Sequence, residues 1–238
     1  MALVDFTVDE HVAVITMNSG ENRLNPPFLT ALLDTLETVE QQTDATSLVV
    51  TASHEKIFSN GLDLDWLLPA YQKGDFATTR SFFYLMNQAF ERILLYPMVT
   101  VAAISGHAFA GGALLACVFD FRFMRSDRGY FCLPEVDLGI PFTPGMNAIL
   151  KKAVPMHMVE EMELTGVRLT AAECERYHIV RKAVAQETLM AEAMAFAKSQ
   201  KKNRPILREM KKRLHRDIVR VFAMEDPPVI ESDNLHAV

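Results

Sequence analysis

Two glycine-bearing turns are the first candidates for chemistry. "FSNGLDL" (58–64) and "SGHAFAGGALL" (105–115) each follow an apolar, β-branched run, and each leads into residues with helical character. A glycine at such a turn serves either close packing or the exposure of a backbone N–H, which the positive end of the following helix makes attractive to an anion. Two turns that direct one N–H each at a shared point would form an oxyanion hole for an enolate.

Few ionisable groups accompany these turns. Glu135 follows Pro134 in "LPEVDLGI" (133–140), where a glutamate can also be an ordinary surface-turn or helix-start residue. Asp63 and Asp65 are more typical of a helix cap than of a catalytic acid. His107 is more typical of a hydrogen-bonded core histidine.

The elements that must position these groups alternate along the first half of the chain. Two strands (3–8 and 11–17) flank Asp9 and Glu10, and helical spacing of apolar residues predicts a helix over 26–42. A strand (47–53), a polar loop (54–67), a long helix (76–96), a strand (99–105), a short apolar helix and a strand (121–127) follow. From Phe142 onward the pattern is mostly helical, and the polar tail after Met224 is expected to be mobile or docked on a neighbour. This order predicts an α/β fold capped by helices.

The segment 99–119 is apolar enough to raise the question of a membrane span. It carries no formal charge over 21 residues. It also contains Gly106, His107, Gly111 and Gly112 and opens with Val99, Thr100 and Val101, which is unfavourable for a transmembrane helix. A buried strand joined by a glycine turn to a buried helix fits better, because strands of parallel sheets are continuously apolar.

Composition narrows the class of protein. Half of the 238 residues are hydrophobic and 23% are charged, which is typical of an ordinary globular protein. The first residues lack the basic and apolar regions of a secretory signal. The three cysteines, Cys117, Cys132 and Cys174, form neither a CxxC motif nor a zinc-binding pattern, so we expect reduced thiols, no metal site and a cytoplasmic location.

Charge is distributed unevenly. The segment 198–216 carries nine Lys or Arg against one Glu, and the whole chain has a net charge of −6. Such a segment is either a solvated helix face or a phosphate-binding surface, whereas the acidic remainder disfavours general nucleic-acid binding.

Four ordered motifs make the chain recognisable. "IFSNGLDL" (57–64), "PMVTVAAISGHAFAGGALLACVFDFRF" (97–123), "LPEVDLGI" (133–140) and "TGVRLTAAECERYHIV" (165–180) resemble the crotonase, or enoyl-CoA hydratase/isomerase, superfamily. "RSDRGYFCLPEVDLGI" (125–140) is most similar to the Δ3,Δ2-enoyl-CoA isomerase branch. The resemblance implies a crotonase-like spiral of repeated ββα units over residues 1–142 and a helical trimerisation region over 143–238, in one functional domain.

The resemblance also assigns roles to residues. The N–H groups of Leu62 and Gly111 would hold the thioester oxygen of an acyl-CoA. Coenzyme A would be part of the substrate, with no separate cofactor, and the chain would form a homotrimer or hexamer. Ser59, Asn60 and Gly61 would form the loop next to the adenine, and Arg23 would contact a phosphate at the CoA entrance. The acyl pocket would be lined by Phe109, Leu114 and Phe142. The basic segment 198–216 could also meet CoA phosphates, within the chain or from a neighbouring subunit.

The acid/base groups decide which reaction follows. Hydratases of the superfamily use two glutamates, and Leu114 stands where the first would be, whereas Glu135 matches the second. Hydration needs water activation and proton delivery, while moving a double bond from C3=C4 to C2=C3 needs one base. The resemblance thus favours an isomerase with Glu135 as the single acid/base. The alternatives are an enoyl-CoA hydratase or thioester hydrolase of the same superfamily, or a non-catalytic acyl-CoA- or RNA-binding relative.

Overall fold

The computed structural model describes residues 2–232, which form two sheets and twelve helices within that range. The larger sheet contains six strands in the order β1 (Val4–Asp9), β2 (Val12–Met17), β3 (Ser47–Ala52), β5 (Val99–Ile104), β7 (Phe121–Arg125) and β10 (Lys182–Val184). The smaller sheet contains β4 (Ile57–Ser59), β6 (His107–Phe109), β8 (Phe131–Cys132) and β9 (Arg168–Leu169). Only the β1–β2 and β8–β9 pairs are antiparallel.

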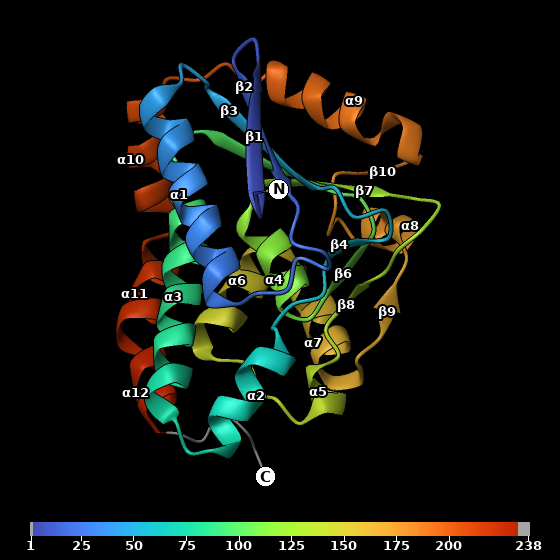
Figure 1. The fold of residues 1–238 in the computed structure, drawn as a ribbon. Helices are drawn as coiled ribbons and strands as arrows, with labels where there is room; N and C mark the ends of the chain where they lie inside the picture. The colour runs from blue at the N-terminus through green and yellow to red at the C-terminus, as the bar shows by residue number, and fades with distance from the viewer. Residues whose placement is uncertain (1, 233–238) are drawn as a thin grey trace.

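The chain repeats one unit as it winds. In the pairs β3–β4, β5–β6 and β7–β8, the first strand joins the larger sheet and the second joins the smaller one. The helices that follow these pairs are α2 (Leu64–Gln72) with α3 (Phe76–Leu94), α4 (Gly111–Val118) and α5 (Glu135–Leu138). Each repeat therefore delivers one turn, between its short strand and its helix, to the same side of the molecule (Figure 1).

The larger sheet is buried on both faces, which explains its continuously apolar strands. Successive side chains of a strand point to opposite faces. Val49 and Val101 pack under α9 (Gln186–Lys198), whereas their neighbours Val50 and Ala102 belong to the main core. The main core lies between this sheet, the smaller sheet and α1 (Pro26–Gln42), α3 and α4.

The remaining helices follow the last repeat. They are α6 (Pro144–Ala153), α7 (Met156–Thr165), α8 (Ala171–Arg176), α10 (Arg204–Leu214), α11 (Arg216–Met224) and α12 (Asp226–Glu231). Figure 1 shows α10, α11 and α12 running down beside α1 and α3. Residues 143–232 also contribute β9 and β10, so this part of the chain completes both sheets as well as covering them.

Most of the predicted elements are confirmed. The hairpin pairs Val4 with Met17 and Asp9 with Val12, and α1 has the predicted bounds, with the Asn25 side chain accepting from the N–H of Phe28 at its start. The long helix ends at Leu94, before Pro97. The short strands β4, β6, β8, β9 and β10 were not predicted, because two or three residues are too few to show a period.

The prediction for the C-terminal tail was wrong for residues 226–231. They form α12, which contacts α3 and α11 of the same chain. Its first residue, Asp226, is fully buried and accepts hydrogen bonds from the N–H of Gly145 and the amide of Asn87, both at 2.7 Å. Residues 233–238, the rest of that tail, lie outside the described range.

Within residues 2–232, no helix combines the length and the hydropathy that crossing a membrane requires. The apolar segment 99–119 is divided among β5, β6 and α4.

Candidate active site

The two glycine turns of the sequence meet in space. A Cβ added to Gly61 would lie 2.6 Å from the nitrogen of Gly111, and one added to Gly111 would lie 3.4 Å from the nitrogen of Leu62. Gly61 has a φ of +75°, and the missing side chain lets the two backbones touch. The predicted pair of N–H groups, from Leu62 and Gly111, is therefore brought together.

Local pairing orients the Leu62 N–H. Leu24 lies beside Leu62 in a short parallel bridge, in which Leu24 donates to the Gly61 carbonyl at 2.7 Å and accepts from Asp63 at 3.0 Å. These bonds occupy the groups on either side of Leu62 and leave its own N–H free. In the described residues, the N–H groups of Leu62 and Gly111 donate to no other group of the chain.

The start of α4 is held in an unusual conformation. Ala110 has a φ of +52° and a ψ of −129°, a region that costs a non-glycine residue about 1–3 kcal/mol. Gly112 packs directly on β4, since a Cβ there would lie 2.2 Å from the carbonyl oxygen of Ser59. The strained turn and the close packing together fix the first N–H of α4, that of Gly111, beside Leu62 at the positive end of the helix.

The opposite end of α4 is capped by a lysine. The ammonium of Lys152 donates to the carbonyls of Cys117, Val118 and Phe119 at 2.8–3.1 Å. Burial lowers the pKa of Lys152 to about 7. This cap satisfies the last carbonyls of the helix and so supports the orientation of α4 at the site.

Glu135 is the first residue of α5 and is almost fully buried, with 3% of its surface exposed. Neither carboxyl oxygen has a hydrogen-bond partner among the described residues. Burial raises the pKa of Glu135 to about 8, with a further contribution from the Glu163 carboxylate, while its own backbone N–H opposes the shift. An unpaired buried carboxyl costs free energy, so its presence points to a chemical role.

One cavity of about 500 Å³ joins these features. Leu62 and Glu135 both line it, together with Ala110 of the strained turn. Its remaining wall residues are Arg23, Ile57, Asn60, Leu64, Asp65, His107, Phe109, Pro134, Leu138 and Ile140. The cavity thus combines the free N–H of Leu62, one buried and unpartnered carboxyl group and a largely apolar wall.

Two of the predicted CoA contacts, Arg23 and Asn60, line this cavity, and both already have partners within the chain. The Arg23 guanidinium donates to Glu21 at 2.8 Å and to Asp65 at 2.7 Å. Asn60 lines the cavity, and its N–H donates to the Glu21 carbonyl at 3.1 Å. Ser59 is buried and donates to the Asn22 carbonyl at 2.7 Å, which holds the loop rather than facing the cavity.

Two of the predicted acyl contacts lie elsewhere. Leu114 is fully buried in the main core and is not part of the cavity wall. Phe142 lines a second hollow, of about 390 Å³, which lies behind Glu135 and which we call the rear chamber. Phe109 does line the main cavity, with the Arg168 guanidinium 5.7 Å above its ring.

The polar residues set aside in the sequence have other partners. Asp63 precedes α2 but makes no capping bond, and it accepts instead from the Asn25 amide at 2.8 Å. His107 lies partly exposed against the ring of Phe109, and its Nδ1 accepts a hydrogen bond from the backbone N–H of Tyr130 at 3.2 Å. Burial lowers the pKa of His107, followed by the charge of Arg168.

The rear chamber contains residues that the sequence did not reveal. Its wall consists of Glu135, Val136, Gly139, Ile140, Pro141, Phe142, Asn147, Glu163 and Leu164. Glu163, on α7, is half-buried. The orientation of the Asn147 amide that satisfies both of its polar atoms places the amide nitrogen 2.7 and 3.1 Å from the two Glu163 carboxyl oxygens, to which it donates. No sequence signal identified Glu163, because it lies outside the four motifs, in a helix that carries two other glutamates, Glu160 and Glu161.

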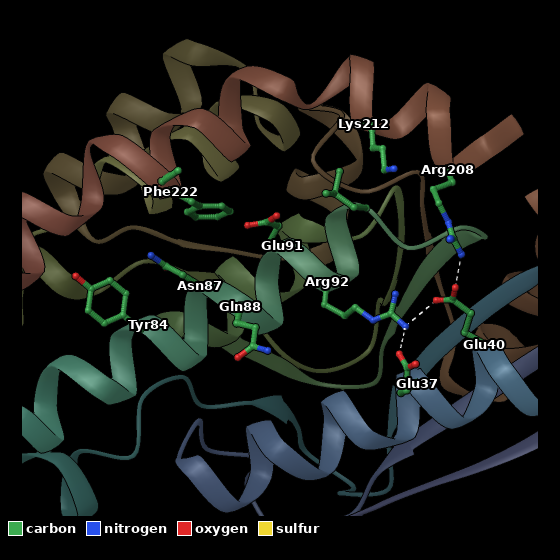
Figure 2. A pocket seen from close by; sticks show the side chains of 12 residues that line it. Glu37, Glu40, Tyr84, Asn87, Gln88, Glu91, Arg92, Arg208, Lys212 and Phe222 are labelled. Carbon is green, nitrogen blue, oxygen red and sulfur yellow. Dashed lines mark hydrogen bonds and ion pairs between the residues drawn. The ribbon is translucent and has the colours of Figure 1, made fainter. Parts of the chain in front are cut away.

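A further hollow lies between α3 and the C-terminal helices (Figure 2). Four of its charged residues form ion pairs with one another: Arg92 contacts both Glu37 and Glu40, and Arg208 contacts Glu40. Glu91 and Phe222 face its middle. It lacks free backbone donors at a helix start, so it does not compete with the Glu135 cavity as a reaction site.

Basic residues of the segment 198–216 form ion pairs with acidic residues of the same chain. Lys198 pairs with Asp9 and Glu10 of the β1–β2 turn, and Lys211 pairs with Asp120 at 2.6 Å. None of its residues lines the Glu135 cavity. Within the subunit, Lys198 and Lys211 attach this segment to the sheet and its connections, and a contact between the segment and CoA phosphates stays a prediction. The described residues contain no group of three or more His, Cys, Asp or Glu arranged to hold a metal ion.

Comparisons with known proteins agree with this fold. A family model described as enoyl-CoA hydratase/isomerase matches residues 7–226. "Enoyl-CoA delta isomerase 3" of Arabidopsis thaliana is 34% identical over 165 residues, 67% of each chain. A "putative enoyl-CoA hydratase" of Thermus thermophilus is 33% identical over 208 residues, 86% of this chain and 80% of that protein.

Solved structures show the same architecture. Human mitochondrial delta3-delta2-enoyl-CoA isomerase superimposes with a TM-score of 0.86 at 24% identity, covering 98% of this chain and 92% of that one. A probable enoyl-CoA hydratase of Mycobacterium tuberculosis gives 0.88 at 21% identity, covering 98% and 97%. The predicted spiral of ββα units is confirmed. The chain belongs to the enoyl-CoA hydratase/isomerase family, the crotonase superfamily.

Proposed function

We propose that the protein is an isomerase that moves the double bond of a 3-enoyl-CoA to the 2-position, with Glu135 as its single acid/base. The observation that supports this most is a cavity lined by a buried, unpartnered carboxyl, Glu135, and by Leu62, whose free N–H lies close to the free N–H of Gly111. The likeness to proteins described as delta isomerases is consistent with it.

The proposed reaction proceeds by proton transfer alone. The Glu135 carboxylate takes a proton from C2, and the electron pair of that C–H bond forms a dienolate whose oxygen accepts from the N–H groups of Leu62 and Gly111. The Glu135 carboxyl then returns the proton to C4, the double bond forms between C2 and C3, and the thioester carbonyl is restored. No water or cofactor enters the balance.

Two features of the site suit this shuttle. Burial raises the pKa of Glu135 to about 8, so its carboxylate is a stronger base than an exposed glutamate. Because its oxygens have no other partner, the carboxyl can follow the proton from C2 to C4. Leu114, a fully buried residue of α4, offers no second carboxyl at the position where hydratases of the family have one.

Hydration is the second candidate, because relatives described as hydratases match at similar identity. An assay that offers the purified protein a 3-enoyl-CoA and, separately, a 2-enoyl-CoA in water distinguishes the two. Isomerisation predicts 2-enoyl-CoA from the first substrate at a rate far above any formation of 3-hydroxyacyl-CoA from the second. Release of free CoA would indicate thioester hydrolysis, and faster hydration than isomerisation would overturn the proposal.

We also propose that the chain assembles as a homotrimer or a dimer of trimers. Ile206, Met210 and Leu214 form an apolar row on α10, and each is more than 60% exposed in the single chain. Such a row is typical of a helix face that another subunit covers. Light scattering of the purified protein tests this, and a monomeric mass at micromolar concentration would contradict it.

A further inference from the structure

The rear chamber holds a second carboxyl group that the proposed reaction does not use. Glu163 extends from α7, and Glu135 is the first residue of α5. The two helices are in contact, and Figure 1 shows them next to each other. Glu135 lines both the main cavity and the rear chamber, so it lies between the proposed substrate site and Glu163.

The surroundings of the two carboxyl groups differ. With the Asn147 amide turned so that its nitrogen faces Glu163, it donates two hydrogen bonds to that carboxylate. Burial raises the pKa of Glu163, and the ammonium of Lys151 opposes this shift. Glu135 is more deeply buried and has no partner. Two carboxylates in one chamber repel each other, so the form with a single negative charge is favoured. Because the Asn147 amide stabilises the carboxylate of Glu163, the negative charge lies on Glu163 and the proton on Glu135.

We propose that Glu163 is a positioning residue for the reaction: its negative charge, held by Asn147 across the rear chamber, strengthens the affinity of Glu135 for its proton. This inference rests on the proposed function for its kinetic consequence. The Glu135 carboxylate is thereby a stronger base toward C2 when it is ionised, and is ionised in a smaller fraction of molecules at neutral pH.

Other charged groups around Glu135 do not provide this charge. Its own helix carries Asp137, and the neighbouring strands carry Cys132 and Arg168. Across the main cavity lie Arg23, Asp65 and His107. Arg23 and Asp65 are paired with each other. None of these groups changes the pKa of Glu135 through its charge, whereas Glu163 does.

The test is the pH dependence of isomerisation in Glu163→Gln, which keeps the size of the side chain and removes its charge. We expect the acidic limb of the pH profile of kcat to shift to lower pH by about half a unit or more. The plateau of kcat at high pH should fall about twofold. Glu163→Asp should retain the wild-type limb. Glu160→Gln, an exposed position on the same helix, is the matched control and should change nothing.

A limb in Glu163→Gln that coincides with wild type would overturn the inference. Loss of activity at every pH in a folded Glu163→Gln would also overturn it, because Glu163 would then be a reacting group. A titration of ¹³C-labelled glutamate by NMR, with the Glu135 signal assigned by its absence in Glu135→Gln, follows the same shift without turnover. If wild type does not isomerise, the proposed function fails, and this titration alone decides the role of Glu163.

Discussion

Two buried carboxyl groups in this molecule have opposite surroundings. Asp226, where α12 meets α3 and α6, is fully buried and accepts from the Gly145 N–H and the Asn87 amide. Glu135, at the cavity, is buried to nearly the same extent and has no partner. A buried polar group with partners contributes to the fold, whereas one without partners costs stability and is retained for another reason. The presence or absence of hydrogen-bond partners thus distinguishes a structural carboxyl group, Asp226, from the carboxyl group that we propose to react, Glu135.

The largest expected effect comes from Glu135→Gln, which keeps the shape of the side chain and removes its basicity. We expect kcat for isomerisation to fall by about 10³-fold or more. Because the carboxyl has no partner to lose, the free energy of unfolding should not decrease. Steady-state kinetics and thermal unfolding measure the two outcomes. Activity near that of wild type in a folded variant would remove Glu135 from the mechanism.

The next effect tests the contact between the two turns. Gly61→Ala places a Cβ 2.6 Å from the Gly111 nitrogen and displaces one N–H from the thioester oxygen, so kcat should fall about 10²-fold. Gly20→Ala is the matched control, since Gly20 also has a positive φ but open space around its Cα. A similar loss in both variants would indicate backbone strain rather than a displaced donor.

Asp226→Ala should have the reverse pattern to Glu135→Gln. It leaves the Gly145 N–H and the Asn87 amide without their acceptor in a buried place, and the free energy of unfolding should decrease by about 2–3 kcal/mol. Activity per folded molecule should be unchanged. Asp217→Ala, an exposed change on α11, serves as the control in urea titrations. Lost activity without lost stability would contradict a structural role.

The smallest effect is the pH dependence of stability. Folding raises the pKa of Glu135 from 4.5 to about 8, so between these values the folded state binds more protons than the unfolded state. Stability is therefore greatest below pH 4.5 as far as this group is concerned, and it decreases as pH rises to about 8. Relative to Glu135→Gln, wild type should lose about 1–2 kcal/mol between pH 6 and pH 7. If urea unfolding gives the same difference in the free energy of unfolding between wild type and Glu135→Gln at every pH, then the pKa of Glu135 in the folded state is that of an ordinary glutamate.

The sequence predicted the parts of this molecule that depend on local pattern. The hairpin, α1, α3 and the strand–turn–helix around Gly111 follow from period, proline and glycine. The motif "LPEVDLGI" identified Glu135 through the family resemblance, and the structure adds that the residue is buried and unpartnered.

What the sequence could not predict depends on contacts between distant segments. The strand pairs β4–β6 and β8–β9 are too short to leave a pattern. The proximity of Glu163 and Asn147 to Glu135 arises from the packing of α6 and α7 on α5, and no spacing along the chain indicates it. Leu114 was placed in the acyl pocket by position in a motif, whereas its side chain points into the core.

The most direct measurement follows the proton itself. A 3-enoyl-CoA carrying deuterium at C2 is converted in H₂O in a single turnover, and the deuterium in the product is located by mass spectrometry and NMR. Because the Glu135 carboxyl is buried and has no partner with which to exchange, we predict that part of the deuterium is recovered at C4 with wild type and that Glu135→Gln forms no product on this time scale. Product formed by Glu135→Gln at the wild-type rate, or a C4 hydrogen that always comes from solvent, would contradict a single-carboxyl shuttle.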